Sequence, residues 1–501
     1  MSSNPGHPNI LIIVMDCVRA SDFVPDPAAH YLPHLAELAK QSVRFPRAVS
    51  PASWTLPSHA SLFTGLYPWE HGVNTMSSLK LSPNIPTIAG YLKKLGYVSA
   101  SVSSNFLISQ EFGLPREFDK IYWGDWWDPY LRLEPKWFGK QTFPGMAEML
   151  RLLRNRGESQ RFPILKKWAR RHSPLVLKYP FILDVPQHFL EKLNGAPSLA
   201  DTSWWVEPTL ETWFKAQKPD KPSLCFINLL DAHEPYFSNA EVVHGLLGWF
   251  KYARIRQDGP PIESKHRKED MELLHALYRQ CISIIDRRIN RVVDLMKATG
   301  RWENTLTFIT ADHGQSFGEH GHFFHSSGIM EPVLRVPLWV RYPYGEGGGR
   351  ISKTWASLVD VLPTILETVG IGGGNNLSGY TLRSLENGPR PKPALTYSNG
   401  HGHLGDFIFV GVDRIDPPRS VSVAAYADKW KVVVRSESKG SFTAFDTDND
   451  PLERTNSWEG SDSTQQVLAK EASAAIDMLC ASQPAAPPQN VVDRLRAWGY
   501  V

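Results

Sequence analysis

Residues 9–16 read NILIIVMD, an apolar run that ends in a carboxylate. Continuous apolar runs of this length are typical of central strands that are covered on both faces of a sheet. In open α/β sheets, ligands bind at the carboxyl ends of such strands, and Asp16 stands at that end. The segment therefore predicts a buried central strand that delivers Asp16 to a binding edge.

Two more apolar segments follow the same plan. Residues 224–230 read LCFINLL and lead into the polar cluster DAHEPY, and residues 306–310 read LTFIT and lead into DHG at 312–314. Helical patterns separate the strands, and this alternation predicts a doubly wound, mostly parallel α/β sheet. The other predicted elements are strands at 97–102 and 336–341 and helices at 33–40, 85–95 and 268–298.

The pattern changes after about residue 390. Three short strands are predicted there, at 421–426, 430–436 and 442–446, and we expect them to pair antiparallel. Helices are predicted at 465–479 and 491–500. We therefore divide the chain into an α/β domain, residues 1–390, and a smaller C-terminal α+β subdomain, residues 391–501.

The composition is that of an ordinary globular protein. The 501 residues include 42% hydrophobic and 21% charged residues, and the net charge of +3 favours no polyanionic partner such as nucleic acid. The four cysteines are widely spaced and suggest no disulfide framework. No apolar run approaches the roughly 20 residues that span a bilayer. We expect a cytoplasmic protein.

The α/β domain contains a basic, tryptophan-rich insertion at about residues 124–220. Between residues 132 and 178 the chain has twelve Lys or Arg and three acidic residues, a local charge of +9. Three interpretations stay open: a surface helical subdomain, a lid or oligomer contact over a site, and peripheral attachment to an anionic membrane surface. No nucleic-acid recognition motif accompanies the charge.

The segment 53–68, which reads SWTLPSHASLFTGLYP, predicts a helix with Pro57 near its first position and Gly65 at its end. Thr55 lies near the helix N-terminus, where free N–H groups and the dipole favour an anion. Thr is also a good N-cap residue. Taken alone, the segment therefore allows a capping role or a catalytic one for Thr55.

This segment resembles the nucleophile motif of the sulfatase family, within the alkaline phosphatase superfamily. The family reads Cys or Ser, any residue, Pro, any residue, Arg, and here Thr55 and His59 hold the first and last positions. GEHG at 318–321 and DPLERTN at 450–456 also resemble family patterns. Thr cannot give formylglycine, so the resemblance implies no formylglycine and a Thr55 that reacts itself, as in the Thr-type phosphoesterases of the superfamily.

The resemblance also implies a divalent metal held by Asp16, Thr55, Asp312 and His313. Carboxylates and imidazole suit several cations. Sulfatases of the family typically use Ca²⁺, whereas Thr-type phosphoesterases more often use Zn²⁺ or Mn²⁺. His313 and a threonine nucleophile favour Zn²⁺ or Mn²⁺, with Ca²⁺ or Mg²⁺ as alternatives. Cys17 stands where the family often has a second acidic residue.

Further roles follow from the same resemblance. His233 matches the family histidine that contacts the leaving-group oxygen. Asn105 and His325 stand at the positions of two lysines that hold the sulfate, and Asn105 is the residue type with which phosphodiesterase members donate to a phosphoryl oxygen. His325 could be a donor or a ligand of a second metal. Substrate contacts are predicted for Arg19, His59 and His320, although the histidine-rich loop that contains His320 could also be a solvated lid.

These observations lead to three hypotheses. The first is a metal-dependent hydrolase or transferase that cleaves a phosphodiester or phosphonate monoester through Thr55, acting on a small-molecule or lipid-like anionic ester. The second is a sulfate ester hydrolase that uses unmodified Thr55. The third, motivated by the departures at Cys17 and His59, is a non-catalytic or repurposed binding protein of the same fold.

Overall fold

The computed structural model describes residues 6–23, 31–124, 203, 205–218, 221–234, 236, 265–325, 328–372, 376–399, 420–438 and 440–482. Most of the basic insertion, including the whole of residues 132–178, and the helix predicted at 491–500 lie outside these ranges.

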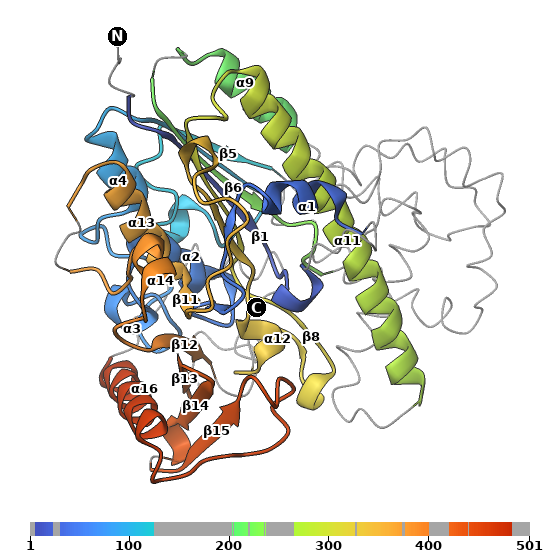
Figure 1. The fold of residues 1–501 in the computed structure, drawn as a ribbon, viewed down its shortest axis with the longest axis vertical. Helices are drawn as coiled ribbons and strands as arrows, with labels where there is room; N and C mark the ends of the chain where they lie inside the picture. Colours follow the sequence, from blue (N-terminus) through green and yellow to red (C-terminus); the bar gives the residue numbers. More distant parts are fainter. Residues whose placement is uncertain are drawn as a thin grey trace.

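A seven-stranded sheet with the strand order β2-β10-β7-β1-β6-β4-β5 forms the centre of the fold (Figure 1). Its strands are β1 (Asn9–Met15), β2 (Val43–Arg44), β4 (Val98–Ser103), β5 (Lys120–Trp123), β6 (Ser223–Leu229), β7 (Thr305–Ala311) and β10 (Leu338–Arg341). From β7 to β5 all neighbours are parallel, which confirms the predicted α/β class with a mostly parallel sheet. β10 runs antiparallel to β7, and the described chain between them contains the short helices Glu319–Gly321 and Glu331–Leu334 and no long crossover helix.

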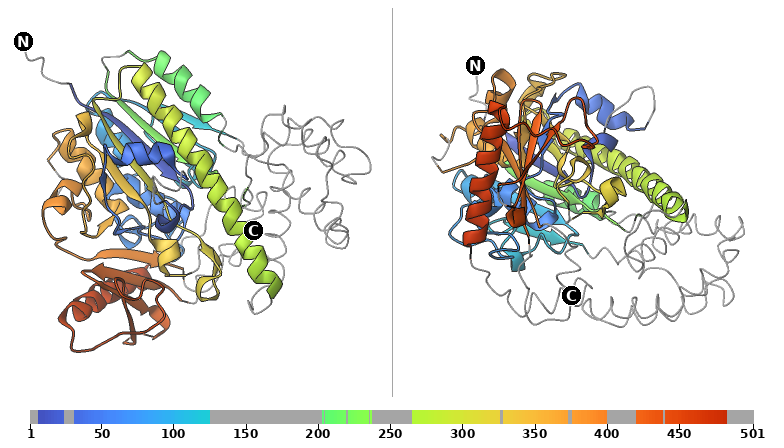
Figure 2. Two further views of the ribbon diagram at one scale, coloured as in Figure 1. Left: turned by 45° about the vertical axis from the view of Figure 1, so that its right-hand side comes forward. Right: turned by 90° about the horizontal axis from the view of Figure 1, so that it is seen from below.

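Helices cover both faces of this sheet (Figures 1 and 2). On one side lie α1 (Pro33–Ala39), α9 (Val206–Lys215) and the long α11 (Lys265–Ala298), and on the other α2 (Thr55–Thr64), α4 (Ile88–Lys93), α13 (Val361–Thr368) and α14 (Leu382–Asn387). The buried side of α9, including Leu210 and Trp213, belongs to the main hydrophobic core. This part of the segment predicted as an insertion, 124–220, is therefore a layer of the main fold.

The position of β1 explains its sequence. Every residue of β1 is buried, and the strand pairs along its length with β6 and β7. Met15 lies in register with Leu229 and with Ala311, so the next residues, Asp16 and Asp312, emerge side by side at the carboxyl edge of the sheet. The register of the central strands thus brings the two carboxylates together.

A second sheet forms the C-terminal subdomain. Its four strands, β12 (Ala394–Ser398), β13 (Ser422–Ala427), β14 (Trp430–Arg435) and β15 (Phe442–Asp446), are antiparallel in sequence order. The last three confirm the predicted strands and their antiparallel pairing, whereas β12 was not predicted. Helix α16 (Ser463–Ala481) packs on β13 and β14 (Figure 2). The remaining short elements are β3 (Ala48–Val49), α3 (Pro68–His71), β8 (Ser316–Phe317), β9 (Phe323–Phe324), α12 (Glu331–Leu334) and β11 (Ala356–Ser357).

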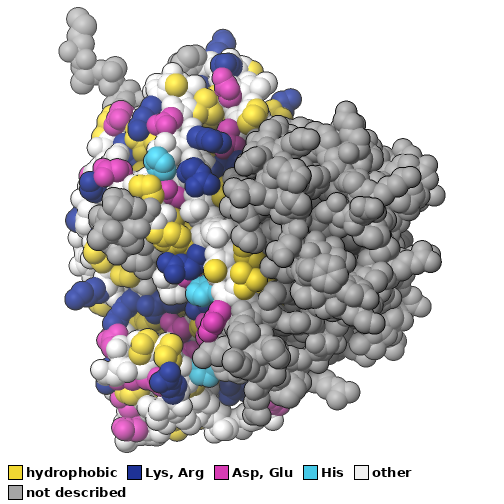
Figure 3. All heavy atoms as spheres, turned by 90° about the vertical axis from the view of Figure 1, so that its right-hand side faces the viewer, with side chains coloured by type: hydrophobic (Ala, Val, Ile, Leu, Met, Phe, Trp, Pro, Cys, Tyr) yellow, Lys and Arg dark blue, Asp and Glu magenta, His cyan; other side chains and the backbone are white. Residues whose placement is uncertain are grey.

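The surface of the described residues carries charges of both signs. On the face shown in Figure 3, Lys, Arg, Asp and Glu side chains are interspersed with hydrophobic ones. This agrees with the small net charge of +3 for the whole chain. In the described part of the chain, no helix combines the length and the apolar character needed to cross a bilayer.

A buried lysine joins the C-terminal sheet to the main domain. Lys431 on β14 is fully buried, and its Nζ donates to the carbonyl oxygen of Ile329 at 2.5 Å and to Glu453. The carboxylate of Glu331 on α12 lies 3.5 Å from the same Nζ and accepts a hydrogen bond from Tyr426 at 3.0 Å. Lys431 therefore links two buried carboxylates from different parts of the chain, and Glu331 also pairs with Arg335 at 3.1 Å.

We predict that Lys431→Met lowers the free energy of unfolding by about 3 kcal/mol, because it leaves the buried carboxylate of Glu453 without its cation and Glu331 with Arg335 alone, while conserving much of the side-chain volume. Chemical denaturation measures this loss. The matched control is Lys429→Met, which removes an exposed lysine two residues earlier and should leave the denaturation midpoint unchanged. Equal midpoints for the two variants would contradict the prediction.

Candidate active site

The site is built around Asp16 and Asp312, both buried. Asp16 Oδ2 accepts hydrogen bonds from the side-chain amides of Asn105 at 2.7 Å and Asn228 at 3.4 Å. Asp312 Oδ1 accepts from the backbone N–H groups of Cys17 and His313, at 3.2 and 2.9 Å. Asp312 Oδ2 is buried and accepts no hydrogen bond from the described residues, so one carboxylate oxygen has a free coordination position.

The two carboxylates differ in their protonation. Burial, followed by the nearby charge of Asp16, raises the pKa of Asp312 to about 7. For Asp16 the effect of burial is outweighed by His233, His313 and the Asn105 hydrogen bond, so its pKa falls below the ordinary value. Two ionised carboxylates in this space repel each other, and a bound cation would relieve that repulsion.

His313 presents one ring nitrogen to the same space. Its Nδ1 lies 2.9 Å from the carbonyl oxygen of Gly314, to which it donates, and its Nε2 lies 3.4 Å from Asp312 Oδ2. The turn needs glycine, because a Cβ on Gly314 would lie 2.1 Å from the carbonyl oxygen of Pro332. The backbone therefore orients His313 with Nε2 available as a ligand atom.

Thr55 is the first residue of α2, and the N-cap position belongs to Trp54, which makes no side-chain capping bond. The Thr55 hydroxyl is thus not used as a cap, and its Oγ1 lies 3.3 Å from His313 Nε2. One turn further, Ser58 donates to the carbonyl oxygen of Asp312 at 2.6 Å and ties the helix to the end of β7. The helix N-terminus is therefore held against the two carboxylates.

The predicted start of this helix needs a correction. Pro57 is its third residue, because α2 begins two residues earlier than we expected. Proline is still tolerated, since the first N–H groups of a helix have no partner within the helix. Gly65 ends the helix in the left-handed conformation, with φ 68°, as its position predicted.

The donor set fits a divalent cation. Ligand atoms of Asp16, Cys17 and His313 lie within 4.8 Å of one another, and Asp312 adds its unpaired oxygen. Buried carboxylate oxygens and a neutral imidazole are ligands for Zn²⁺ and Mn²⁺ as well as for harder cations. A divalent metal is typical of the family, and the residues present suit one without fixing its identity.

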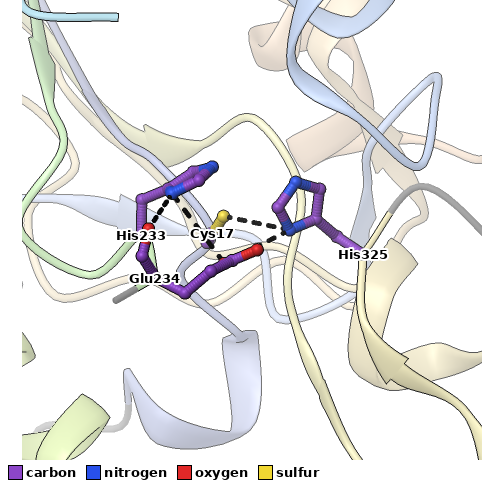
Figure 4. Close-up of side chains that lie close together, drawn as sticks. All are labelled: Cys17, His233, Glu234 and His325. Carbon is purple, nitrogen blue, oxygen red and sulfur yellow. Dashed lines mark hydrogen bonds and ion pairs between the residues drawn. The ribbon is translucent and has the colours of Figure 1, made fainter. Parts of the chain in front are cut away.

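A second group of side chains adjoins the first. His233 and Glu234 follow β6, and His325 follows β9 (Figure 4). The rings of His325 and His313 are 4.6 Å apart between centroids, and those of His325 and His233 are 5.1 Å apart. Burial lowers the pKa of His233, but the carboxylates of Glu234 and Asp16 outweigh it and raise the pKa above its ordinary value. The structure thus brings His233 and His325 beside His313.

Asn105 has a contact that differs from the predicted one. Its amide donates to Asp16, and its Oδ1 accepts from the backbone N–H of Leu107 at 2.9 Å. This geometry holds Asp16 in place, and a direct contact of Asn105 with a phosphoryl oxygen stays a prediction.

The three residues predicted to contact substrate are engaged with the protein. His59 is fully buried and lies one turn after Thr55 on the same face of α2, so its Nδ1 donates to the carbonyl oxygen of Thr55 at 2.9 Å. Its ring packs edge-on against Phe226. Arg19 pairs with Glu319 at 2.8 Å. His320 is exposed, and its Nε2 lies 2.7 Å from the carbonyl oxygen of Leu452 in the C-terminal subdomain. These contacts hold the three side chains against the protein, and their predicted contact with substrate stays a prediction.

Three site residues were missed at the level of sequence. Asn228 is the polar residue inside the apolar strand β6, which was a usable signal. Glu234 stood in the quoted cluster DAHEPY without a role, and Gln315 follows DHG directly. Gln315 joins the loops by donating from Nε2 to Glu234 at 2.8 Å and to the Tyr236 hydroxyl at 2.6 Å.

Comparison with known proteins agrees with this fold. The family model described as "Sulfatase" matches residues 8–371, so the chain belongs to the sulfatase family, a family of hydrolases in the alkaline phosphatase-like superfamily. The chain is 24% identical to the uncharacterised sulfatase YidJ of Escherichia coli, over 80% of this chain and 76% of that protein. It is also 24% identical to a choline-sulfatase of Rhizobium meliloti, over 90% and 82% of the two chains.

Solved structures show the same architecture. A phosphonate monoester hydrolase from Silicibacter pomeroyi superposes with a TM-score of 0.63 at 19% identity, covering 94% of each chain. The phosphonate monoester hydrolase of Agrobacterium radiobacter gives a TM-score of 0.61 at 18% identity and covers 94% of this chain and 96% of that one. At this level of identity the likeness shows the fold.

We predict that a divalent cation stabilises the protein through Asp312. At a concentration 100 times its dissociation constant, a cation that binds only the folded state adds about 2.7 kcal/mol to stability. Asp312→Asn should lose this gain, whereas the control Asp446→Asn, in the C-terminal sheet, should keep it. Thermal melts with and without Zn²⁺ or Mn²⁺ measure the effect, and a full gain in the Asp312 variant would refute it.

The metal-free protein should show the opposite response to the same substitution. A carboxyl whose pKa is raised on folding loses stability as the pH rises from its ordinary pKa to about 7. Metal-free Asp312→Asn should therefore melt at a higher temperature than the parent protein at pH 8, and the difference should shrink at pH 5. A constant difference across this range would contradict the assignment.

Proposed function

We propose that the protein is a metal-dependent hydrolase or transferase that cleaves a phosphate ester, either a phosphodiester or a phosphonate monoester, through Thr55. The observation that carries this proposal is the placement of the Thr55 hydroxyl, which is free of capping and lies beside His313 at the start of α2. The shared fold with two phosphonate monoester hydrolases supports the choice of phosphorus chemistry. The substrate class is a small-molecule or lipid-like anionic ester.

Asp16, Asp312 and His313 would hold the metal, with Thr55 at its open side. When bound, the metal would supply positive charge that lowers the pKa of the Thr55 hydroxyl and neutralises the ester oxygens. The first turn of α2 presents backbone N–H groups to the same oxygens. Asn105 and the backbone N–H groups of Cys17 and His313 keep the two carboxylates in position.

In the chemical step, the Thr55 oxygen attacks phosphorus and the bond from phosphorus to the leaving oxygen breaks. His233, whose raised pKa favours the protonated form, donates a proton to the leaving oxygen. The product is a phosphoryl or phosphonyl ester of Thr55. Water or an alcohol then attacks this intermediate, which makes the protein a hydrolase or a transferase respectively.

The test is turnover of a matched aryl panel that contains a phosphate monoester, a phosphodiester, a phosphonate monoester and a sulfate. Thr55→Ala should lose phosphorus-ester turnover by a factor on the order of 10³ or more, as expected for loss of a nucleophile. Thr64→Ala removes a hydroxyl from the other end of the same helix, where it donates to Ala60, and should keep turnover. Unchanged turnover in Thr55→Ala would refute the proposal.

The covalent intermediate gives an independent prediction. Rapid acid quenching during turnover of a slow phosphonate ester should leave a modified peptide that contains Thr55, detectable by mass spectrometry. The peptide should be absent from Thr55→Ala. Turnover without any modified peptide at saturating substrate would favour direct attack by water.

Sulfate ester hydrolysis through unmodified Thr55 is the second candidate, favoured by the family match and by the choline-sulfatase relative. It ranks lower because Asn105 and His325 stand where the resemblance places two sulfate-binding lysines. Turnover of the aryl sulfate alone would make it the first candidate. Metal binding without turnover of any ester would instead favour a repurposed binding protein.

A further inference from the structure

We propose that Cys17, His233, Glu234 and His325 form a second divalent-cation site beside the Asp16–Asp312–His313 group, suited to Zn²⁺. Each side chain offers one ligand atom, and these atoms all lie within 4.8 Å of one another. In Figure 4 the sulfur of Cys17 lies between the two imidazole rings. The mixture of thiol, imidazole and carboxylate ligands is one that Zn²⁺ prefers.

Both imidazoles turn Nδ1 toward the carboxylate of Glu234. His233 donates from Nδ1 to the carbonyl oxygen of Glu234 at 2.7 Å. His325 Nδ1 lies 2.9 Å from Gln315 Oε1, and the side-chain nitrogen of Gln315 is occupied by Glu234 and Tyr236, which fixes the direction of the amide. The ring nitrogens that lie near the other ligand atoms are the Nδ1 atoms, at 3.8 and 3.6 Å from Glu234 for His233 and His325. Each Nδ1 would therefore exchange its present oxygen partner for the cation.

The backbone aims Cys17 into this space. Cys17 has a φ of 64°, which is uncommon for a residue other than glycine. Its N–H donates to Asp312 and its carbonyl oxygen accepts from the Tyr278 hydroxyl at 2.9 Å, so both backbone groups are held. As a result the sulfur lies 3.3 Å from Asp16 Oδ1 and 3.6 Å from His325 Nδ1.

The charge of the cluster also calls for a cation. Glu234 lies within ion-pair distance of His233 and His325, at 3.8 and 3.6 Å. Asp312 has ion-pair contacts with His59 and His313. Among the described residues these carboxylates thus pair with histidines and with no lysine or arginine. Buried carboxylates are stable when they are paired or when they coordinate a metal.

Only a small closure of the side chains is needed. The ligand atoms of one tetrahedral Zn²⁺, with bonds of about 2.0–2.3 Å, stand roughly 3.3–3.8 Å apart. Starting from separations within 4.8 Å, shifts of about 1 Å complete the shell.

Cys17 belongs to both groups, because it also lies with Asp16 and His313. If the proposed function holds, on which this role in catalysis rests, two cations would flank the ester, with Thr55 near one and the leaving oxygen near the other. His233 would then be a ligand, and the charge on the leaving oxygen would be met by a cation in place of a proton.

The experiment uses the full chain, stripped of metal and reloaded with Co²⁺ as a spectroscopic substitute for Zn²⁺. We expect two Co²⁺ per chain by elemental analysis and a near-ultraviolet charge-transfer band from a thiolate bound to cobalt. Cys17→Ser should lose the band and bind one Co²⁺. His325→Ala should also bind one Co²⁺. Because His325 is partly exposed, this variant tests the second site even if Cys17→Ser fails to fold.

The controls separate the sites. Cys480→Ser removes an exposed thiol on α16 and should keep both ions and the band, and Asp312→Asn should keep the band while losing the other ion. One Co²⁺ per chain without a thiolate band, or two ions in Cys17→Ser, would overturn the second site.

The second site and the proposed function can fail separately. Phosphorus-ester turnover with one bound ion would leave the proposed function intact. Two bound ions without any ester turnover would overturn that function and leave the second site standing.

Discussion

The burial of two carboxylates side by side is the constraint on which the rest of the site depends. Asp16 and Asp312 emerge from adjacent parallel strands whose register is set by a continuous apolar interface. Their mutual repulsion in a buried setting is compensated in part by hydrogen bonds from the backbone and from Asn105. The negative charge that these hydrogen bonds do not compensate makes the carboxyl edge of this sheet suited to binding a cation.

The surrounding elements are arranged to serve that edge. Ser58 ties the first turn of α2 to the end of β7, and Gly314 lets the following turn pass close to the backbone of Pro332. The second sheet reaches the same helix, because the backbone N–H of Ser53 donates to the carbonyl oxygen of Tyr397 on β12 at 3.0 Å. The C-terminal subdomain therefore supports the start of α2, where Thr55 lies.

Much of the fold could be predicted from local patterns. The strands β1, β6 and β7 are buried at every residue, so strands in these positions are mostly apolar and can be recognised in the sequence. The antiparallel direction of β10 could not be seen, since it depends on how the chain returns after β7. The C-terminal boundary of the insertion could not be predicted either, because only tertiary contacts show that α9 packs in the main core.

The sequence by itself determined which side chains stand at the carboxyl ends of the central strands, because strand ends follow from apolar runs that stop at polar residues. The resemblance to the sulfatase family then implied that Asp16, Asp312 and His313 share one metal. Only the tertiary structure decided which atoms face one another. In the folded protein, Asn105 donates to Asp16, and His59 donates to the carbonyl oxygen of Thr55. His320 contacts the C-terminal subdomain. Glu234 and His325 lie beside Cys17. These contacts join residues up to 308 positions apart, and local pattern carries no information about the direction of a side chain over such a separation.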